Sequence, residues 1–175
     1  MTIHIPTWIN CVLTPVEKLE AHQKGLKHKA ISVFIIRDGQ TLLQQRAASK
    51  YHTPGLWANA CCTHPYWEED SQDCATRRLQ EELGIAGLSL DYRDTVEYRA
   101  AVGDGLTEHE VVDIYVAQAP SNLEMDLNPS EVQDTTWIPI SSLTDIVREA
   151  PHKYTPWLRI YVEQFSDIIF QPASV

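Results

Sequence analysis

Histidine and glutamate side chains suited to binding a divalent cation recur along the first two thirds of the chain. They are His22, His28, His64, Glu108 and Glu110. Imidazole nitrogens and carboxylate oxygens are common ligands of Zn²⁺ and Mn²⁺. Glu108 and Glu110 are two residues apart in a segment with strand character, so they share one face and repel each other without a cation between them. The alternatives are a solvated strand face and ordinary surface or core histidines.

Two adjacent thiols, Cys61 and Cys62, lie just before His64 in a turn-rich segment. A thiol near a cation or metal can titrate in a range that is useful for proton transfer. Most buried cysteines, in contrast, only fill space. Because neighbouring residues of an extended segment point to opposite sides, we expect Cys61 to be dispensable wherever Cys62 is used.

Basic residues occur singly and form no run. They include Lys18, Arg46, Lys50, Arg77 and Arg78. Such residues could converge on one phosphate group, although solvation at the surface is the usual state of each. The formal net charge of -10 argues against binding to nucleic acid or to an anionic membrane surface. An anionic substrate would therefore have to be bound by a few local cations.

Length and composition indicate one globular domain over residues 1–175, of which 43% are hydrophobic. The chain has no run of about 20 apolar residues and no signal-peptide pattern at Met1-Thr2-Ile3-His4. We therefore expect a cytoplasmic protein that does not enter a membrane. The four cysteines form no CxxC pair, so we expect reduced thiols.

Turn residues and apolar periodicity predict a mixed sheet with helices. Strands are expected at residues 29–37, 41–45, 95–101, 110–118 and 135–138. Asp38-Gly39 and Gly103-Asp104-Gly105 lie where tight hairpin turns would join them. The sequence therefore predicts an α/β fold of the α+β type, a single layered domain.

Three helices are expected to flank this sheet. The first has Ser71 as its N-cap and ends at Gly84, the second spans residues 142–149 and ends before Pro151. The third begins at Thr155-Pro156 and runs through Trp157. In the first helix Arg78 and Glu82 are four residues apart and so lie on one edge.

The joint order of these features resembles the Nudix superfamily and, within it, the type I isopentenyl diphosphate isomerases, from Lys18 to about Trp157. The Nudix pattern Gx5Ex7REUxEExGU is met by Thr63, Glu69, Arg77, Arg78, Leu79, Glu81, Glu82, Gly84 and Ile85. Thr63 replaces the leading glycine, and Arg78 replaces the glutamate that hydrolases of the superfamily use to gather metal ions. Arg78 therefore counts against diphosphate hydrolysis.

Several further segments are similar to the isomerase signature. They are Glu17 to His22, His28, Gln45 to Lys50, Pro54 to Asn59, Cys62 to Pro65 and Glu108 to Val111. The segment before Lys18 fits that pattern less well, since it lacks the usual glycine-containing turn. The resemblance implies a Nudix fold, a mixed β-sheet core flanked by helices. It also implies the isomerisation of isopentenyl diphosphate to dimethylallyl diphosphate by protonation and deprotonation, in isoprenoid biosynthesis.

The resemblance also implies roles for individual residues. His22, His28, His64, Glu108 and Glu110 would enclose Mn²⁺, Zn²⁺ or Mg²⁺. Glu82 and the Cys62 carbonyl would serve a substrate-bound Mg²⁺. Lys18, Arg46, Lys50 and Arg78 would bind the diphosphate. Cys62 and Glu110 would be the acid-base pair, with Tyr98 beside Glu110 and Trp157 facing the reacting carbon.

Two other functions stay open at this point. A Nudix hydrolase of a nucleoside diphosphate derivative is supported by Glu81 and Glu82 and opposed by Arg78. A non-catalytic module that binds a diphosphate is the other, but a binding module would not need Cys62. We expect a monomer that takes a small-molecule substrate.

Overall fold

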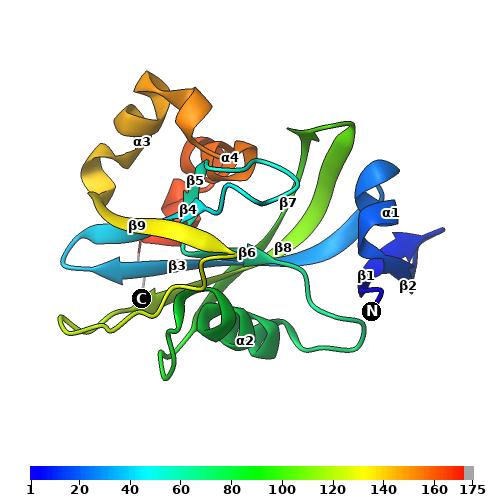
Figure 1. The fold of residues 1–175 in the computed structure, drawn as a ribbon, viewed down its shortest axis with the longest axis horizontal. Coiled ribbons are helices and arrows are strands. Elements are labelled where there is room, and N and C mark those ends of the chain that lie inside the picture. Colours follow the sequence, from blue (N-terminus) through cyan, green and yellow to red (C-terminus); the bar gives the residue numbers. More distant parts are fainter. Residues whose placement is uncertain (172–175) are drawn as a thin grey trace.

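The computed structural model describes residues 1–171, and one mixed sheet organises this part of the chain (Figure 1). Its strands are β1 (His4–Ile9), β2 (Val12–Glu17), β3 (Lys27–Arg37), β4 (Gln40–Arg46), β5 (Trp57–Asn59), β6 (Cys61–Thr63), β7 (Asp91–Gly103), β8 (Leu106–Gln118) and β9 (Val132–Pro139). Strand β3 pairs in parallel with β8 and antiparallel with β1, β4 and β6. The single domain expected over residues 1–175 stays a prediction, and its last four residues lie outside the described residues.

Helices cover both faces of the sheet. They are α1 (Lys18–Gln23), α2 (Ser71–Leu83), α3 (Ile140–Glu149), the 3-10 helix η1 (Pro151–Lys153), α4 (Pro156–Gln164) and α5 (Ser166–Phe170). Helix α2 lies on one face, and α3 and α4 lie on the other (Figure 1). A separate apolar core fills each interface, which is the packing that burial of two sheet faces requires. The predicted mixed sheet with flanking helices is confirmed.

Both predicted hairpins form where the turn residues indicated. Asp38 and Gly39 have φ values of 49° and 75° between β3 and β4. Gly103, Asp104 and Gly105 also have positive φ between β7 and β8. A two-residue turn with positive φ matches the twist of the strands that it joins, which explains the choice of Asp and Gly.

Pairing in the centre of the sheet gathers chemically active residues into one row. His28 on β3 lies opposite Glu110 on β8, and Tyr98 on β7 lies opposite Glu110 on its other side. On the neighbouring pair, Ser32 of β3 lies opposite Cys62 of β6. Residues at paired positions share a face of the sheet, so this register fixes which side chains meet.

The N-cap of helix α2 lies one residue earlier than the sequence pattern indicated. Asp70, not Ser71, is the N-cap, and its carboxylate accepts hydrogen bonds from the backbone of Gln72 and Asp73. The Ser71 hydroxyl is occupied elsewhere, donating a 2.6 Å hydrogen bond to Asp113. The predicted end is confirmed, since Gly84 caps the helix with φ of 65°.

The first 23 residues contain elements that the sequence pattern did not indicate. Strands β1 and β2 form a hairpin whose turn holds Asn10 and Cys11, both with positive φ. Helix α1 follows directly, and Glu17 caps it. At the other end, α5 follows α4 after a break at Phe165.

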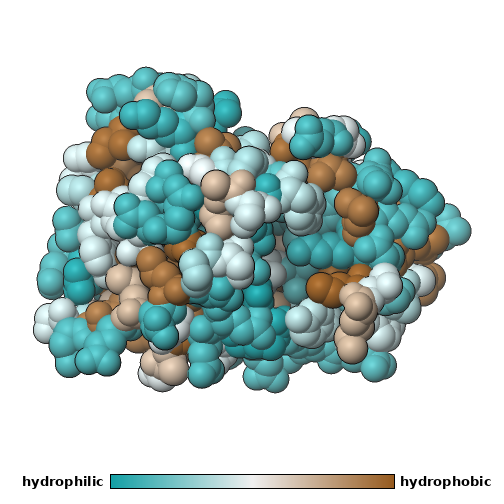
Figure 2. Space-filling view, in the orientation of Figure 1, coloured by the Kyte–Doolittle hydropathy of each residue, from teal (hydrophilic) through white to brown (hydrophobic). Residues whose placement is uncertain are grey.

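The molecular surface is mainly hydrophilic on the face shown in Figure 2, with separate small hydrophobic patches. Within residues 1–171, every helix is too short or too polar to cross a membrane.

Candidate active site

One small pocket, of about 40 Å³, collects most of the residues that the sequence singled out. Its walls include Lys18, Arg46, Lys50, Cys62, His64, Arg78, Glu82, Tyr98, Glu108, Glu110 and Trp157. These residues come from strands on both sides of β3, from the loop after β4 and from three helices. The predicted acid-base pair and the predicted diphosphate ligands therefore share a single cavity.

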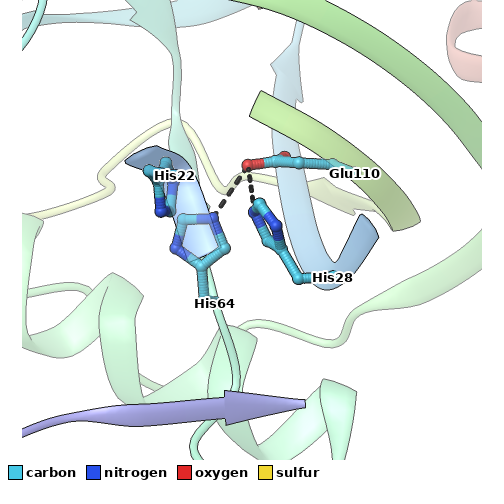
Figure 3. Close-up of side chains that lie close together, drawn as sticks. All are labelled: His22, His28, His64 and Glu110. Atoms are coloured by element: carbon cyan, nitrogen blue, oxygen red, sulfur yellow. Dashed lines mark hydrogen bonds and ion pairs between the residues drawn. The ribbon is translucent and has the colours of Figure 1, made fainter. Parts of the chain in front are cut away.

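Behind the pocket wall lies a buried cluster of three histidines and one glutamate (Figure 3). The members are His22, His28, His64 and Glu110, and the candidate ligand atoms all lie within 4.8 Å of one another. Oε1 of Glu110 lies 2.8 Å from Nε2 of His64 and 3.5 Å from Nε2 of His28. The cluster joins α1, β3, β8 and the segment after β6.

The imidazoles are oriented as metal ligands would be. Nδ1 of His22 and Nδ1 of His28 each lie 2.7 Å from a backbone carbonyl oxygen, of Lys18 and Leu26 respectively. A carbonyl only accepts, so both rings carry the proton on Nδ1 and turn the lone pair of Nε2 toward the cluster. Both Nε2 atoms are buried without a hydrogen-bond partner, as is Nδ1 of His64. A buried polar atom without a partner costs free energy, and a divalent cation would give these nitrogens one. This donor set therefore fits a divalent cation.

Burial keeps the ring of His64 neutral. Removal from water is the main cause that lowers the pKa of His64 well below its usual value. The pKa of His22 is lowered by burial and then by the neighbouring His28. Neutral imidazoles are the form that binds metal, so the electrostatics of the cluster agree with its geometry.

Glu108 lies outside this four-residue cluster, although we expected it among the metal ligands. Its carboxyl group lies 2.8 Å from the hydroxyl of Tyr98, which also lies 2.8 Å from the carboxylate of Glu110. Burial and the adjacent charge of Glu110 raise the pKa of Glu108 well above its usual value. Its role as a ligand stays a prediction.

The two neighbouring thiols point in opposite directions, as expected from their extended backbone. Cys61 is fully buried in the core under α2. Cys62 faces the pocket, where its thiol donates a 2.9 Å hydrogen bond to Oδ1 of Asn59. Burial raises the pKa of Cys62, so the resting group is a thiol.

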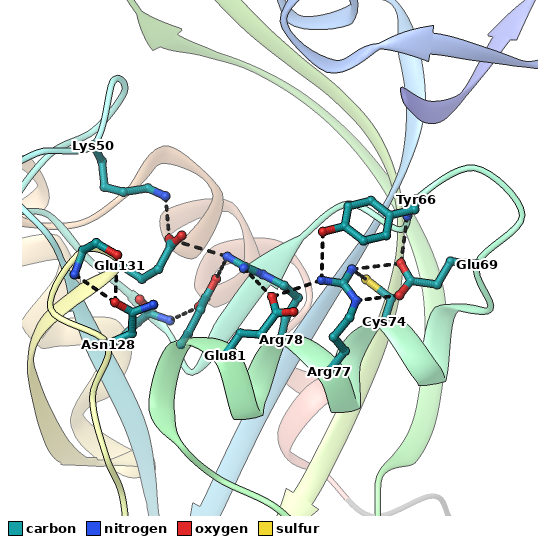
Figure 4. Close-up of polar contacts among 12 residues, drawn as sticks. Lys50, Tyr66, Glu69, Cys74, Arg77, Arg78, Glu81, Asn128 and Glu131 are labelled. Atoms are coloured by element: carbon teal, nitrogen blue, oxygen red, sulfur yellow. Dashed lines mark hydrogen bonds and ion pairs between the residues drawn. The ribbon is translucent and has the colours of Figure 1, made fainter. Parts of the chain in front are cut away.

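Cations and carboxylates alternate in a network that contains two cations of the pocket, Lys50 and Arg78 (Figure 4). Glu131 accepts a 2.6 Å hydrogen bond from Lys50 and lies 3.5 Å from Arg78. Arg78 also contacts Glu81 and Glu82, the latter at four-residue spacing. The Arg78 guanidinium is therefore held by carboxylates, and a diphosphate would have to share it with them.

Lys18 and Arg46 are the other two of the four predicted diphosphate ligands that line the pocket. Burial lowers the pKa of Lys18, and the nearby charges of Lys50 and Arg78 lower it further, which is the sign of converging cations. Glu82 is buried and accepts a 2.9 Å hydrogen bond from Gln44. An added anion or a cation bound at Glu82 would relieve these local charges.

Arg77, the remaining basic residue of the sequence pattern, has a structural position outside the pocket. Its guanidinium makes two hydrogen bonds to Glu69, at 2.7 and 2.9 Å, and stacks on Tyr66 (Figure 4). This pairing ties the loop before α2 to the helix.

Trp157 is buried and lines the pocket, and the guanidinium carbon of Arg46 lies 5.2 Å from its ring centre. Next to it lie Tyr51 and His52, which sequence reasoning did not select. Nε2 of His52 lies 3.6 Å from Glu108. His52 could have been selected from the sequence, because it lies two residues after Lys50, a predicted diphosphate ligand.

Comparison with known proteins agrees with this arrangement. A family model described as the NUDIX domain matches residues 26–162. The chain is 62% identical to a protein of Jannaschia sp. (strain CCS1) named isopentenyl-diphosphate Delta-isomerase, over 99% of both chains. It is 57% identical to a protein of the same name from Rhodobacter capsulatus, over 97% of each.

Solved structures share the fold at lower identity. The DR0079 protein of Deinococcus radiodurans superposes with a TM-score of 0.72 at 13% identity, covering 92% of this chain and 98% of that one. A MutT NUDIX hydrolase from Burkholderia pseudomallei gives a TM-score of 0.61 at 26% identity, covering 79% of this chain and 98% of its own.

Proposed function

The chain belongs to the NUDIX family and, within it, to the isopentenyl-diphosphate Delta-isomerases, and from this premise we propose that it converts isopentenyl diphosphate to dimethylallyl diphosphate. The reaction is a 1,3-allylic shift by protonation and deprotonation, in isoprenoid biosynthesis. One observation carries the proposal: a thiol and a carboxylate, Cys62 and Glu110, line the same small pocket from different strands.

The substrate's double bond is unactivated, so one carbon must gain a proton while another loses one. Two groups have to flank the hydrocarbon for this exchange. Glu110, assisted by Tyr98, is proposed as the proton donor and Cys62 as the acceptor, which requires a protonated Glu110 and a Cys62 thiolate when the substrate is bound. In the metal-free protein Cys62 is a thiol, and His64 and His28 lower the pKa of Glu110 against the effect of burial. That state corresponds to the reverse assignment, which coupling between the groups allows. The buried face of Trp157 would stabilise the cationic intermediate, an interaction of roughly 2 kcal/mol in a dry site. Exclusion of water protects that intermediate from capture.

Lys18, Arg46, Lys50 and Arg78 are proposed to bind the diphosphate. Their convergence on one pocket supports this role, because several single cations suit a phosphate group better than one isolated contact. Glu82 and the Cys62 carbonyl are proposed to hold a substrate-bound Mg²⁺. Binding at this remote end would orient the reacting carbons between the thiol and the carboxylate.

The histidine cluster is proposed to hold Zn²⁺, Mn²⁺ or Mg²⁺, with Glu108 as an additional ligand. Three imidazoles and a carboxylate suit Zn²⁺ or Mn²⁺ more than Mg²⁺, which prefers oxygen ligands. A bound cation would supply positive charge that tunes the proton affinity of Glu110. The expected monomer and cytoplasmic location stay predictions.

The test incubates purified protein and Mg²⁺ with isopentenyl diphosphate, follows dimethylallyl diphosphate by NMR and measures phosphate release in parallel. Cys62→Ser should fold and lose isomerisation, while Cys61→Ala, its matched control, should retain it. Phosphate release without isomer would instead establish a NUDIX hydrolase. If the protein forms no isomer and releases no phosphate, a diphosphate-binding module is the remaining function.

A further inference from the structure

Behind the Cys62 thiol lies a buried chain of hydroxyl groups that connects the pocket to helix α4. Oγ of Ser32 lies 3.0 Å from Sγ of Cys62, and Oη of Tyr161 lies 2.7 Å from Oγ of Ser32. Ser32 is 1% exposed and Tyr161 is fully buried. Polar atoms at such depth require partners, and these two hydroxyls find them only along this line among the described contacts.

The proton positions in this chain follow from its two ends. The amide nitrogen of Asn59 donates to the carbonyls of Val33 and Cys61, so its Oδ1 faces Cys62 and can only accept. The thiol therefore donates to Asn59. At the other end, Oγ of Ser32 is the only hydrogen-bond partner of the Tyr161 phenol among the described contacts. Only one assignment then gives every proton an acceptor, from Tyr161 to Ser32 to Cys62 to Asn59.

Helix α4 presents two residues to this region at four-residue spacing. Trp157 lines the pocket, and Tyr161 reaches the back of the thiol one turn later. The ring of Tyr161 is also fixed by edge contacts with Phe34 and Tyr98, with centroids 5.7 Å apart in each case. A shift of α4 would therefore move the aromatic wall and the thiol's support together.

We propose that Ser32 and Tyr161 are positioning residues that hold the Cys62 sulfur at the correct place and orientation opposite Trp157 and Glu110. The inference rests on the proposed isomerase function. Ser32 supports the sulfur from the paired position on β3, and Tyr161 fixes the rotamer of Ser32 by occupying its oxygen. Neither side chain lines the pocket, so neither touches the substrate.

A double-mutant cycle on kcat and KM tests this role, using Ser32→Ala, Tyr161→Phe and the pair. Tyr161→Phe removes one oxygen atom and keeps the ring packing. We expect each single variant to lower kcat about tenfold with KM within about twofold, as loss of one buried hydrogen bond allows. The double variant should lose no more than the worse single one, because both act through one sulfur.

Tyr115→Phe is the matched control, since Tyr115 is a buried tyrosine of the α2 side. Thermal unfolding of every variant is measured alongside. Wild-type kcat in Tyr161→Phe, or additive losses in the double variant, would overturn the proposal, even where the melting temperature falls. An inactive wild-type protein would instead remove the proposed isomerase function itself, so the two failures are distinct.

Discussion

Tyr98 and Glu110 stand directly opposite each other on β7 and β8, and the Tyr98 hydroxyl donates a 2.8 Å hydrogen bond to the Glu110 carboxylate. The same hydroxyl lies 2.8 Å from Glu108. One phenol proton cannot satisfy two ionised carboxylates at once, so the second contact needs a proton on a carboxyl group. The raised pKa of Glu108 makes that residue the proton carrier.

We predict that Tyr98→Phe lowers kcat by about tenfold and changes KM by less than about twofold. The variant loses the hydroxyl that orients Glu110, whereas the four cations proposed to bind the diphosphate are unchanged. Steady-state kinetics with isopentenyl diphosphate check this. Tyr92→Phe is the control, because the exposed Tyr92 hydroxyl contacts Thr95 away from the pocket. An unchanged kcat in Tyr98→Phe would exclude a role for the phenol in orienting Glu110.

Removal of metal should destabilise the protein through the histidine cluster. A cation that binds only the folded state, and whose free concentration is about 100 times its Kd, adds about 2.7 kcal/mol to the free energy of unfolding. We predict that Zn²⁺ or Mn²⁺ raises the melting temperature of chelated protein, and that His28→Ala abolishes the shift. His109→Ala, outside the cluster, should keep it. A metal-induced shift of equal size in His28→Ala would contradict the assignment of the cluster.

Local signals were enough to predict the two long hairpins and the course of α2. Each has a turn or cap position with positive φ that favours glycine, such as Gly39 and Gly84. Strands β5 and β6 have three residues each, too few for a periodic pattern, and only pairing with β3 and β4 defines them. The cap at Asp70 was missed because Ser71 is an equally good capping type.

Site residues followed from a family pattern in the sequence rather than from spacing. Nothing local places His28 beside Glu110, because the parallel pairing of β3 with β8 joins distant segments. Ser32 and Tyr161 were missed for a different reason. Each lies in an apolar segment where one hydroxyl resembles a core substitution, and only the three-dimensional contacts reveal its partner.

Gly84 should tolerate no side chain at the end of α2. A Cβ there would lie 2.7 Å from the backbone nitrogen and oxygen of Asp126 and would need positive φ. Gly84→Ala should lower the free energy of unfolding by about 2 to 4 kcal/mol. Gly87→Ala, also at positive φ but in open space, should cost about 1 kcal/mol. Denaturant unfolding measures both, and equal losses would show that the close approach of Asp126 is unimportant.

The buried histidines should make the metal-free protein acid-sensitive. Burial, followed by the charges of Arg46 and Lys18, lowers the pKa of His52 to about 3. Between pH 6.5 and 3 the unfolded chain therefore binds a proton that the folded chain excludes, and stability is lost as the pH falls. At pH 5 this loss is roughly 2 kcal/mol for such a histidine.

Unfolding of metal-free protein at pH 7.5, 6 and 5 measures the slope, and His52→Gln should make it shallower because its side chain does not titrate. The partly exposed His109 supplies the control, and His109→Gln should leave the steep slope of the wild type. The lowered pKa values of His22 and His64 also reduce stability as the pH falls. The difference in slope between the two variants separates the contribution of His52 from theirs and from that of the carboxylates. Equal slopes in both variants would mean that His52 is hydrated and titrates normally in the folded protein.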